Sequence, residues 1–231
     1  MIKYIRSLAE LLFPRYCESC SQRLCMGEQM FCTSCNGSLP RRDDMLSPCD
    51  NEVARLFWGL MPLERGASWI DYVPHSGHAS AIYNMKYNGR SDIAETLGRM
   101  VAMEFMPYGF FEDIDMIIPM PLHKKRERQR GYNQSREFAL GLSSVAHVPL
   151  ADGVVCRSRN TLSQTTMSGE SRVGNVKGAF CLLRPELIAG KHVLLVDDII
   201  TTGATVASCG MELAKAENLK ISCLSIGKTV D

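Results

Sequence analysis

The sequence has almost no net charge, since 26 Lys and Arg residues balance 25 Asp and Glu residues. This balance gives no support for a protein that binds nucleic acid through its overall charge, or for an acidic tail. No apolar run approaches the roughly 18 residues of a membrane span, and Arg6 and Glu10 interrupt the segment where a signal peptide would need a continuous apolar core. We therefore expect a cytoplasmic protein, peripheral to the inner membrane at most through partners.

Two common nucleotide-binding motifs are missing as well. No G-x-G-x-x-G follows an expected strand. Gly190-Lys191 superficially resembles part of a P-loop, but Pro185 stands where the first glycine belongs and His192 where Ser or Thr is needed. The sequence also has no internal repeat and no low-complexity tract. Its 231 residues fit one α/β enzyme domain with a small appendage.

Short apolar strands alternate with helical patterns along most of the chain. We expect one helix that opens at a capping box of Asp92 and Glu95, another over 133–145, and a third that starts near Thr205. This alternation is typical of βαβ units and a parallel sheet. The expected strands are 69–73, 116–119, 154–156, 193–196 and 221–226.

The amino-terminal part of the chain has a different pattern. Residues 2–12 carry one apolar helix face, which ends at Pro14. We expect this face to pack on its own domain, with a partner protein or a membrane surface as the alternative. Residues 40–66 lack a regular pattern and are the expected joint. We assign residues 1–50 to an amino-terminal helix with a cysteine element, and residues 51–231 to the main domain.

Four of the ten cysteines form two C-x-x-C pairs, Cys17 with Cys20 and Cys32 with Cys35, separated by eleven residues. Two such knuckles supply four thiolates to one zinc ion, which can stabilise a segment too short to bury its own core. We expect structural zinc, with a redox C-x-x-C or scattered cysteines as alternatives. Cys25 lies between the pairs and is a poorer candidate ligand. The other five are expected to be small core residues: Cys49, Cys156, Cys181, Cys209 and Cys223.

An acidic pair and a hydroxyl-rich turn follow the apolar run 193–196. A continuous apolar run is typical of a central parallel strand covered on both faces. Asp197 and Asp198 are expected at its carboxyl end, where the ligand crevice of an open α/β sheet lies. The turn 201–205 then opens a helix whose free N–H groups favour a phosphate, and Gly203 permits close approach of the backbone. The pattern predicts a sugar-phosphate site, and a solvated acidic turn is the alternative.

Residues 124–130 form a basic run with five cationic residues and one anionic residue. By itself such a run is most simply a solvated loop. On a mobile loop it can instead fold over a polyanion such as a leaving pyrophosphate, and a patch for nucleic-acid phosphates is a third alternative. Only Tyr132 supplies an aromatic ring near the run, which counts against direct binding of single-stranded DNA there. Lys86 precedes an Asn88-Gly89 turn and is a second candidate for pyrophosphate, or else a surface lysine.

The acidic pair with the turn 201–205 resembles the motif by which type I phosphoribosyltransferases bind PRPP, 5-phosphoribosyl 1-pyrophosphate. Residues 130–134, R-G-Y-N-Q, are similar to the R-G-F/Y-N-Q signature of the ComF family, where P-x-P-L also precedes it. Met120 and Tyr132 stand where Val and Phe are frequent, and both keep an apolar contact. With the cysteine pairs, the resemblance covers residues 14–227. Further matching residues are Lys86, Arg157, Thr161, Gln164, Arg172, Asn175 and Phe180.

This resemblance implies an α/β fold, a type I phosphoribosyltransferase-like parallel sheet flanked by helices, with a small amino-terminal zinc-ribbon-like element. It implies transfer of phosphoribosyl from PRPP, bound with Mg²⁺, to an unknown acceptor, in a protein that supports competence and DNA uptake. Asp197 and Asp198 would be the catalytic pair that orients the ribose. The implied substrate-binding residues are Thr201, Thr202, Gly203, Ala204 and Thr205 for the 5-phosphate and Lys86, Arg126 and Arg130 for pyrophosphate.

Two other functions fit the same residues, because a fold does not fix an activity. The chain would then be a sensor that binds PRPP or a nucleotide without turning it over. Alternatively, it would be a zinc-containing adaptor that holds single-stranded DNA or DNA-uptake proteins.

Overall fold

The computed structural model describes residues 14–158 and 178–230. The helix expected over 2–12, and Thr161, Gln164, Arg172 and Asn175, lie outside the described residues. None of the described helices is long and apolar enough to cross a membrane. These helices are α2 (Thr33–Gly37), α3 (Glu52–Arg55), α4 (Ala79–Tyr87), α5 (Ser91–Phe105), α6 (Lys124–Arg130), α7 (Gln134–Ala146) and α8 (Ala204–Leu213), with 3-10 helices η1 (Asp44–Leu46), η2 (Met106–Tyr108) and η5 (Pro185–Leu187).

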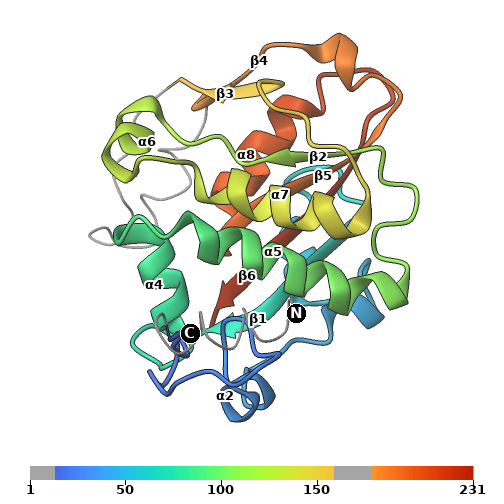
Figure 1. Cartoon of the computed structure of the whole chain (residues 1–231). Coiled ribbons are helices and arrows are strands. Elements are labelled where there is room, and N and C mark those ends of the chain that lie inside the picture. The colour runs from blue at the N-terminus through green and yellow to red at the C-terminus, as the bar shows by residue number, and fades with distance from the viewer. Residues whose placement is uncertain (1–13, 159–177, 231) are drawn as a thin grey trace.

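A four-stranded parallel sheet forms the centre of the molecule (Figure 1). Its order is β1 (Arg65–Tyr72), β6 (Lys220–Thr229), β5 (His192–Ile200) and β2 (Met116–Pro119). All four were expected as strands from their apolar runs, and β1, β5 and β6 are longer than those runs. The expected strand 154–156 is β3 (Val155–Arg157), which pairs antiparallel with β4 (Phe180–Leu182) in a separate two-stranded sheet.

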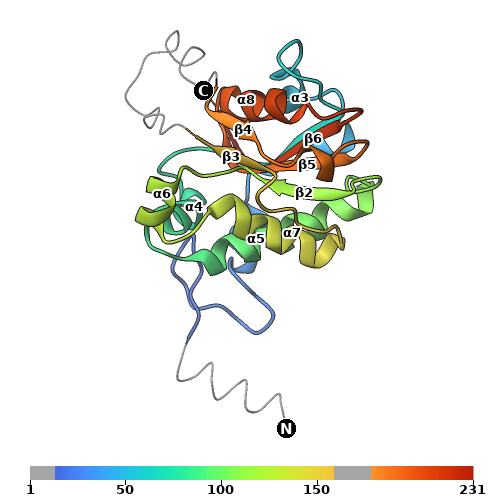
Figure 2. The same cartoon turned by 90° about the horizontal axis from the view of Figure 1, so that it is seen from above.

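Helices cover both faces of the parallel sheet, as the continuous apolar run in β5 requires. Figure 2 shows α5 and α7 on one face and α3 and α8 on the other. Leu194 and Val196 belong to the buried cluster beneath α5 and α7, whereas Val193 and Leu195 belong to the cluster beneath α8. The sheet is therefore buried from both sides, which leaves its edges and strand ends for function.

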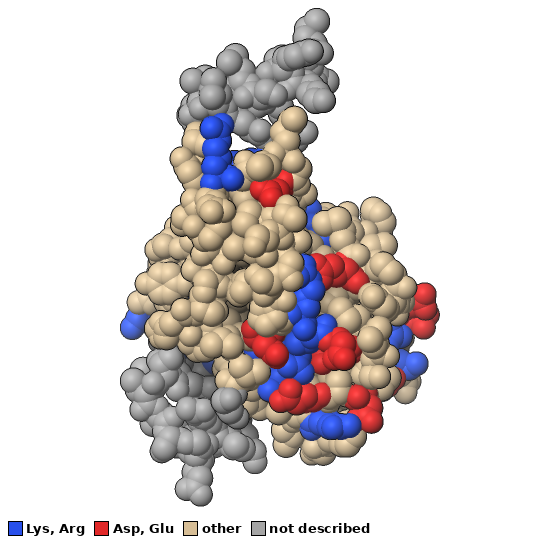
Figure 3. Space-filling model, turned by 90° about the horizontal axis from the view of Figure 1, so that it is seen from below, with Lys and Arg blue, Asp and Glu red and all other residues tan. Residues whose placement is uncertain are grey.

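Residues 40–66, expected as an irregular joint, contain η1 and α3 and are fixed to the sheet. Arg42 pairs with Asp44 at 2.9 Å, with Glu52 at 3.0 Å and also with Asp71 of β1. The buried Asp44 carboxylate accepts the backbone N–H of Ser68 at 2.9 Å. Figure 3 shows basic and acidic side chains interspersed on the face it presents, so no field of one sign covers that face.

Three sequence predictions of local structure were wrong. Asp92 and Glu95 form no capping box, since Asp92 pairs with Arg90 at 2.8 Å and the amino-terminal cap of α5 lacks a side-chain hydrogen bond. The basic run is the helix α6 and not a loop. The backbone amide of Lys125 donates to His123 Nδ1 at the start of α6, and Gly131, with a φ of 84°, ends the helix. Cys49 and Cys181 are exposed, whereas Cys209 and Cys223 are buried as expected.

Helices α5 and α7 approach each other through Gly98 and Gly141. A Cβ added to either glycine would lie less than 3.0 Å from backbone atoms of the facing helix. In an ordinary helix interior alanine is about 1 kcal/mol more favourable than glycine. Here the methyl group would force the helices apart, so the sign of the effect should reverse.

We expect Gly98→Ala to lower the free energy of unfolding by about 1–3 kcal/mol, the usual cost of overpacking. Chemical denaturation of the parent and the variant measures this difference. Gly37→Ala is the matched control, because a Cβ at Gly37 meets nothing within 4 Å. A Gly98→Ala variant as stable as the parent would show that α5 and α7 can separate at no cost.

Candidate functional site

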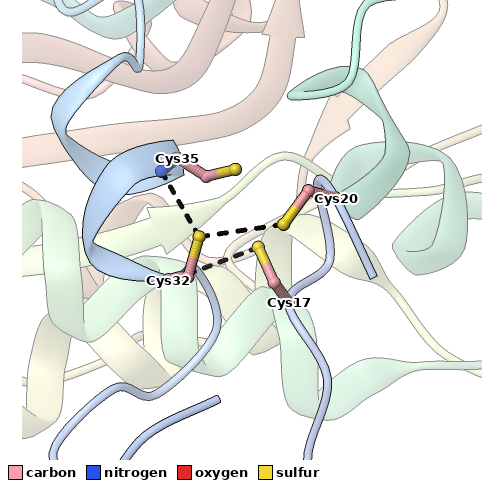
Figure 4. A group of neighbouring side chains, drawn as sticks. All are labelled: Cys17, Cys20, Cys32 and Cys35. Atoms are coloured by element: carbon pink, nitrogen blue, oxygen red, sulfur yellow. Dashed lines mark hydrogen bonds between the residues drawn. The ribbon is translucent and has the colours of Figure 1, made fainter. Parts of the chain in front are cut away.

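The four paired cysteines lie together at the start of the described chain. Their sulfur atoms are all within 4.8 Å of one another, and Figure 4 shows the side chains turned toward a common centre. Zinc bonds thiolates at about 2.3 Å, which places tetrahedral ligands about 3.8 Å apart, and Cys20 Sγ lies 3.7 Å from Cys32 Sγ. The cluster can therefore hold one tetrahedral zinc ion.

Local hydrogen bonds shape this cysteine segment, residues 14–39. The amide of Cys32 donates to Cys17 Sγ at 3.3 Å, and the amide of Cys35 donates to Cys32 Sγ at 3.5 Å, which starts α2. Glu28 accepts the amides of Cys25 and Thr33, and these bonds lower the pKa of Glu28. Cys25 is exposed and stands outside the four-cysteine cluster.

The cysteine segment packs directly on the main domain. Met30 and Phe31 are buried in the same apolar cluster as the faces of α4 and α5. Glu18 accepts a hydrogen bond from Asn84 of α4 at 2.8 Å and pairs with Arg90 at 3.2 Å. The segment is thus held close to the carboxyl ends of the strands, beside α4 (Figure 1).

A cleft of about 250 Å³ lies at the carboxyl end of β5. It brings together most of the side chains that the sequence singled out, from α4, α6, β5 and the turn before α8. Thr202, Gly203 and Ala204 do not line this cleft, and Tyr87, Gln134 and Ser135 line it without having been predicted. The predicted residues that line it are Lys86, Arg126, Arg130, Asp197, Asp198, Thr201 and Thr205.

The acidic pair lies within the last part of β5, which extends to Ile200. Ser135 Oγ donates to Asp197 Oδ1 at 3.1 Å, and Lys86 Nζ lies 3.1 Å from Asp198 Oδ2. Burial, and then the neighbouring Asp198 charge, raise the pKa of Asp197 to about 7. The two carboxylates are therefore unequal, since Asp198 has a cation beside it and the pKa of Asp197 is raised.

The turn after the acidic pair leads into the amino terminus of α8. Gly203 has a φ of 73°, which favours glycine, and a Cβ there would meet the Phe57 ring at 2.9 Å. Thr201 and Thr205 line the cleft on either side of this glycine. A helix amino terminus with free N–H groups and flanking hydroxyls is suited to a phosphate.

Cations dominate the rest of the cleft. Lys86, Arg126, Arg130 and Arg157 line it, whereas Asp197 and Asp198 are the only acidic residues among its described lining. The guanidinium of Arg130 lies 5.7 Å from the centre of the Tyr87 ring. Burial, and then the charge of Arg130, lower the pKa of Arg126. Guanidinium groups gathered in this way suit a ligand with several phosphate charges.

Each residue of the R-G-Y-N-Q stretch has a separate structural role. Gly131 ends α6, and the Tyr132 hydroxyl donates to the carbonyl of Met85 in α4. Asn133 caps α7, because its side chain accepts the amide of Ser135 at 3.1 Å and donates to the carbonyl of Met120 at 3.0 Å. These contacts tie α4, α6 and α7 together around the cleft.

Gln134 ends the stretch and faces the cleft. Its Oε1 accepts from Arg130 Nη1 at 2.9 Å. The side chain is only 2% exposed, and its Nε2 has no hydrogen-bond partner among the described residues. A buried amide donor without a partner is costly, so a ligand that accepts its hydrogen bond would be favoured.

Comparison with known proteins shows which family this chain resembles. Residues 133–227 match the family described as phosphoribosyl transferase domain. The DNA utilization protein YhgH of Shigella flexneri is 31% identical over 227 residues, covering 93% of this chain and 98% of the relative. Competence protein F of Haemophilus influenzae is 31% identical over 138 residues, covering 58% of this chain and 60% of the relative. Competence protein ComFC of Bacillus subtilis is 30% identical over 109 residues, covering 45% of this chain and 41% of the relative.

The matched domain includes β5, the acidic pair and the turn that opens α8. The relative from Shigella matches across nearly its whole length, so the likeness extends to the cysteine segment as well. The parallel sheet with helices on both faces is the fold that the sequence implied. The chain belongs to the ComF family of proteins with a phosphoribosyltransferase fold.

Proposed function

We propose that the cleft at the end of β5 binds PRPP and that the protein transfers its phosphoribosyl group to an acceptor. The observation that carries this proposal is the meeting of an acidic pair, two threonines of the turn before α8 and four cations in one cleft. Each of these features alone is common. Together they match the three chemical parts of PRPP, which are vicinal hydroxyls, a 5-phosphate and a pyrophosphate.

In this proposal each part of the cleft has one task. Asp197 and Asp198 accept hydrogen bonds from the ribose hydroxyls, and Lys86 leaves its ion pair with Asp198 to meet a phosphate oxygen. The amino terminus of α8 with Thr201, Thr202, Gly203, Ala204 and Thr205 holds the 5-phosphate. Arg126 and Arg130, with the donor of Gln134, bind the pyrophosphate.

The transfer step is a displacement at C1 of the ribose. The acceptor nucleophile forms a bond to C1 while the bond from C1 to the pyrophosphate oxygen breaks, and pyrophosphate leaves with the electron pair. The proton of the acceptor passes to water or to an ionised carboxylate of the cleft. The chain contributes orientation and stabilisation of charge, which are large terms when donors are positioned in advance.

Magnesium would enter this cleft with the substrate. Mg²⁺ prefers phosphate oxygens, carboxylates and water, and the acidic pair is the carboxylate source in the described lining of the cleft. The ion would neutralise charge on the pyrophosphate. Structural zinc, held by Cys17, Cys20, Cys32 and Cys35, would have no part in the transfer.

Release of pyrophosphate tests for turnover. The purified protein is incubated with PRPP, Mg²⁺ and candidate acceptors one at a time, and pyrophosphate is quantified. We expect release that depends on both PRPP and one class of acceptor. Firm binding of PRPP with no release in the presence of any acceptor would support a non-catalytic sensor.

Arg130 provides a specific test of the pyrophosphate contact. We expect Arg130→Ala to weaken binding of PRPP by roughly tenfold or more, since charge-assisted hydrogen bonds contribute about 1.5–3 kcal/mol. Binding of ribose 5-phosphate, which has no pyrophosphate, should change little. Calorimetric titration of both ligands measures the difference.

Arg128→Ala is the matched control, because Arg128 lies on the same helix, is exposed and does not line the cleft. It should leave both affinities unchanged. Equal losses for the two ligands in Arg130→Ala would show that Arg130 supports the fold of the cleft instead.

A role in DNA uptake is the second candidate, supported by the names of the relatives from Haemophilus influenzae and Bacillus subtilis. In that role the chain would be an adaptor for single-stranded DNA or DNA-uptake proteins. Loss of transformation in a competent host that carries a chain with Asp198→Asn would link the cleft to that process. Transformation at the parent's level with this variant would show that DNA uptake does not depend on the cleft.

A further inference from the structure

Two cysteines face each other across the small antiparallel sheet formed by β3 and β4 (Figure 1). The register pairs Cys156 of β3 directly with Cys181 of β4. Both are free thiols, of which Cys181 is exposed and Cys156 is half-buried. Residues directly opposite each other in a strand pair point to the same face of the sheet, so the two thiols are neighbours.

The face that carries the cysteines is accessible, whereas the other face of the strand pair is buried. Side chains alternate along a strand, and Val155 and Phe180, next to the cysteines in sequence, pack in the apolar cluster beneath α8. Cys156 lines a hollow of about 580 Å³ whose walls also include the start of α6. A small dissolved reagent can therefore approach the cysteine pair.

The hydrogen bonds of the strand pair fix the distance between the two cysteines. The amide of Ser158 donates to the carbonyl of Ala179 at 2.8 Å, and the amide of Leu183 donates to the carbonyl of Val154 at 2.8 Å. Hydrogen-bonded pairs alternate with non-bonded pairs, so the cysteine pair, midway between these two, is a hydrogen-bonded pair. Its Cα atoms are then about 5.5 Å apart, within the range of about 4.4–6.8 Å that a disulfide spans.

The same register makes a disulfide at this place a strained one. Cβ atoms directly opposite each other lie about 4.5–5.5 Å apart, with the longer distances at hydrogen-bonded pairs, whereas a disulfide prefers about 3.8 Å. The two strands must therefore draw together for the bond to form. Strained and exposed disulfides are the ones that are readily reduced again. The cysteine pair thus suits a reversible bond better than a permanent one.

The residue after Cys156 connects the cysteine pair to the cleft. Arg157 lines the cleft at the end of β5. Its guanidinium lies 5.5 Å from the centre of the Phe180 ring, which is opposite Arg157 in the strand pair. Three residue pairs make a short sheet, and short two-stranded sheets are marginally stable. A covalent bond between the strands would restrict their opening and so hold Arg157 in the cleft.

We propose that Cys156 and Cys181 are a redox modification site, oxidised to a reversible disulfide by a low-molecular-weight disulfide such as oxidised glutathione. The thiolate of the exposed Cys181 attacks one sulfur of the reagent, a mixed disulfide forms, and one reduced thiol leaves. Cys156 then attacks the Cys181 sulfur, the mixed bond breaks, and the second reduced thiol leaves. Two cysteine thiols are oxidised and one reagent disulfide is reduced, while the two thiol protons pass through water to the leaving thiolates.

The oxidised strand pair should open less often than the reduced one. We expect hydrogen exchange of the Ser158 and Leu183 amides to slow by about tenfold or more, because a cross-link disfavours the opened strands. Binding of PRPP should become about two- to tenfold tighter, which corresponds to ordering one long side chain in advance. This expectation for PRPP, unlike the disulfide itself, rests on the proposed function.

Peptide mapping tests the site directly. The purified full chain is incubated with oxidised glutathione, the remaining thiols are alkylated, and linked peptides are identified by mass spectrometry. We expect a peptide pair joined through Cys156 and Cys181 that disappears after treatment with dithiothreitol. Cys181→Ser should lose this link. Cys49→Ser is the matched control and should keep it, because Cys49 is also exposed but lies outside the strand pair.

Hydrogen exchange and calorimetric titration of PRPP then compare the oxidised and reduced parent with Cys181→Ser treated in the same way. Two results would overturn the assignment. One is a parent whose Cys156 and Cys181 stay unmodified, or carry separate glutathione adducts, with no link between them. The other is a linked parent whose Ser158 and Leu183 amides exchange as fast as in the reduced protein.

Titration of PRPP separates this site from the proposed function. Equal affinities of the oxidised and reduced forms would refute the connection between the disulfide and the cleft. No binding of PRPP by either form would refute the proposed function, while the linked peptides and the slowed exchange would still establish the redox site.

Discussion

Protein with Cys17→Ser is expected to contain much less than one zinc ion per chain and to lose several kcal/mol of stability. In small metal-bound elements the free energy of metal binding is free energy of folding. Cys17 is buried, and its sulfur belongs to the four-cysteine cluster and accepts the amide of Cys32. Serine supplies no thiolate, so both the ion and the knuckle should be lost.

Elemental analysis of protein prepared without chelators and thermal unfolding measure these two effects. Cys25→Ser is the matched control, because Cys25 is exposed and lies outside the cluster. It should retain one zinc ion and the parent's melting temperature. A parent without stoichiometric zinc, or a Cys17→Ser variant with a full complement, would refute the zinc assignment.

The same variant tests how independent the cysteine segment is. No residue of the segment lines the cleft, so binding of PRPP should change little in any fraction that stays folded. Met30 and Phe31 nevertheless share a buried cluster with α4 and α5. Simultaneous loss of PRPP binding and of the segment's structure would show that the assigned domains, 1–50 and 51–231, fold as one cooperative unit.

The second large effect is expected at the acidic pair. Asp198→Asn keeps the size of the side chain but removes a charged acceptor, so PRPP affinity should fall by roughly 10- to 100-fold. The double variant with Asp197→Asn should lose more. Asp50→Asn is the control for charge, since Asp50 pairs with Arg55 at an exposed site away from the cleft.

We expect these substitutions to lower the affinity for PRPP without lowering the free energy of unfolding. The folded chain raises the pKa of Asp197 from 3.8 to about 7, because the carboxyl is buried beside Asp198. Ionisation of Asp197 therefore opposes folding, and its contribution makes the parent less stable as pH rises from about 4 to 7. Removing the Asp197 charge in the double variant should therefore cost no stability at neutral pH on this account, and a large loss of stability in Asp197→Asn would indicate a structural role of this side chain instead.

Much of the cleft could be predicted from sequence because its parts are local. The apolar run before Asp197 indicated a buried parallel strand, and the turn before α8 combined glycine with flanking hydroxyls. Both features depend on residues next to each other in the chain. The position of Lys86 could not be predicted from neighbouring residues alone, since its place beside Asp198 depends on how α4 packs against the sheet.

The residues that sequence analysis missed depend on distant contacts. Ser135 reaches Asp197 because α7 packs beside β5, and its own sequence position shows only a serine near a helix start.

Helix α6 was mistaken for a loop for a physical reason. Residues 124–130 have no apolar face, and repulsion among five cations argues against a helix. His123 caps its amino terminus, Gly131 ends it, and Arg126 and Arg130 line the same cleft as the acidic pair. The two caps are short-range signals that an apolar periodicity does not show.

The most direct test of the central proposal is calorimetric titration of PRPP into the parent protein in the presence and absence of Mg²⁺. We predict binding at a single site, tighter with Mg²⁺, and weaker binding of ribose 5-phosphate, which lacks the pyrophosphate. No binding of PRPP at millimolar concentration with Mg²⁺, or equal affinities for PRPP in the parent and in the double variant of Asp197 and Asp198, would contradict the account.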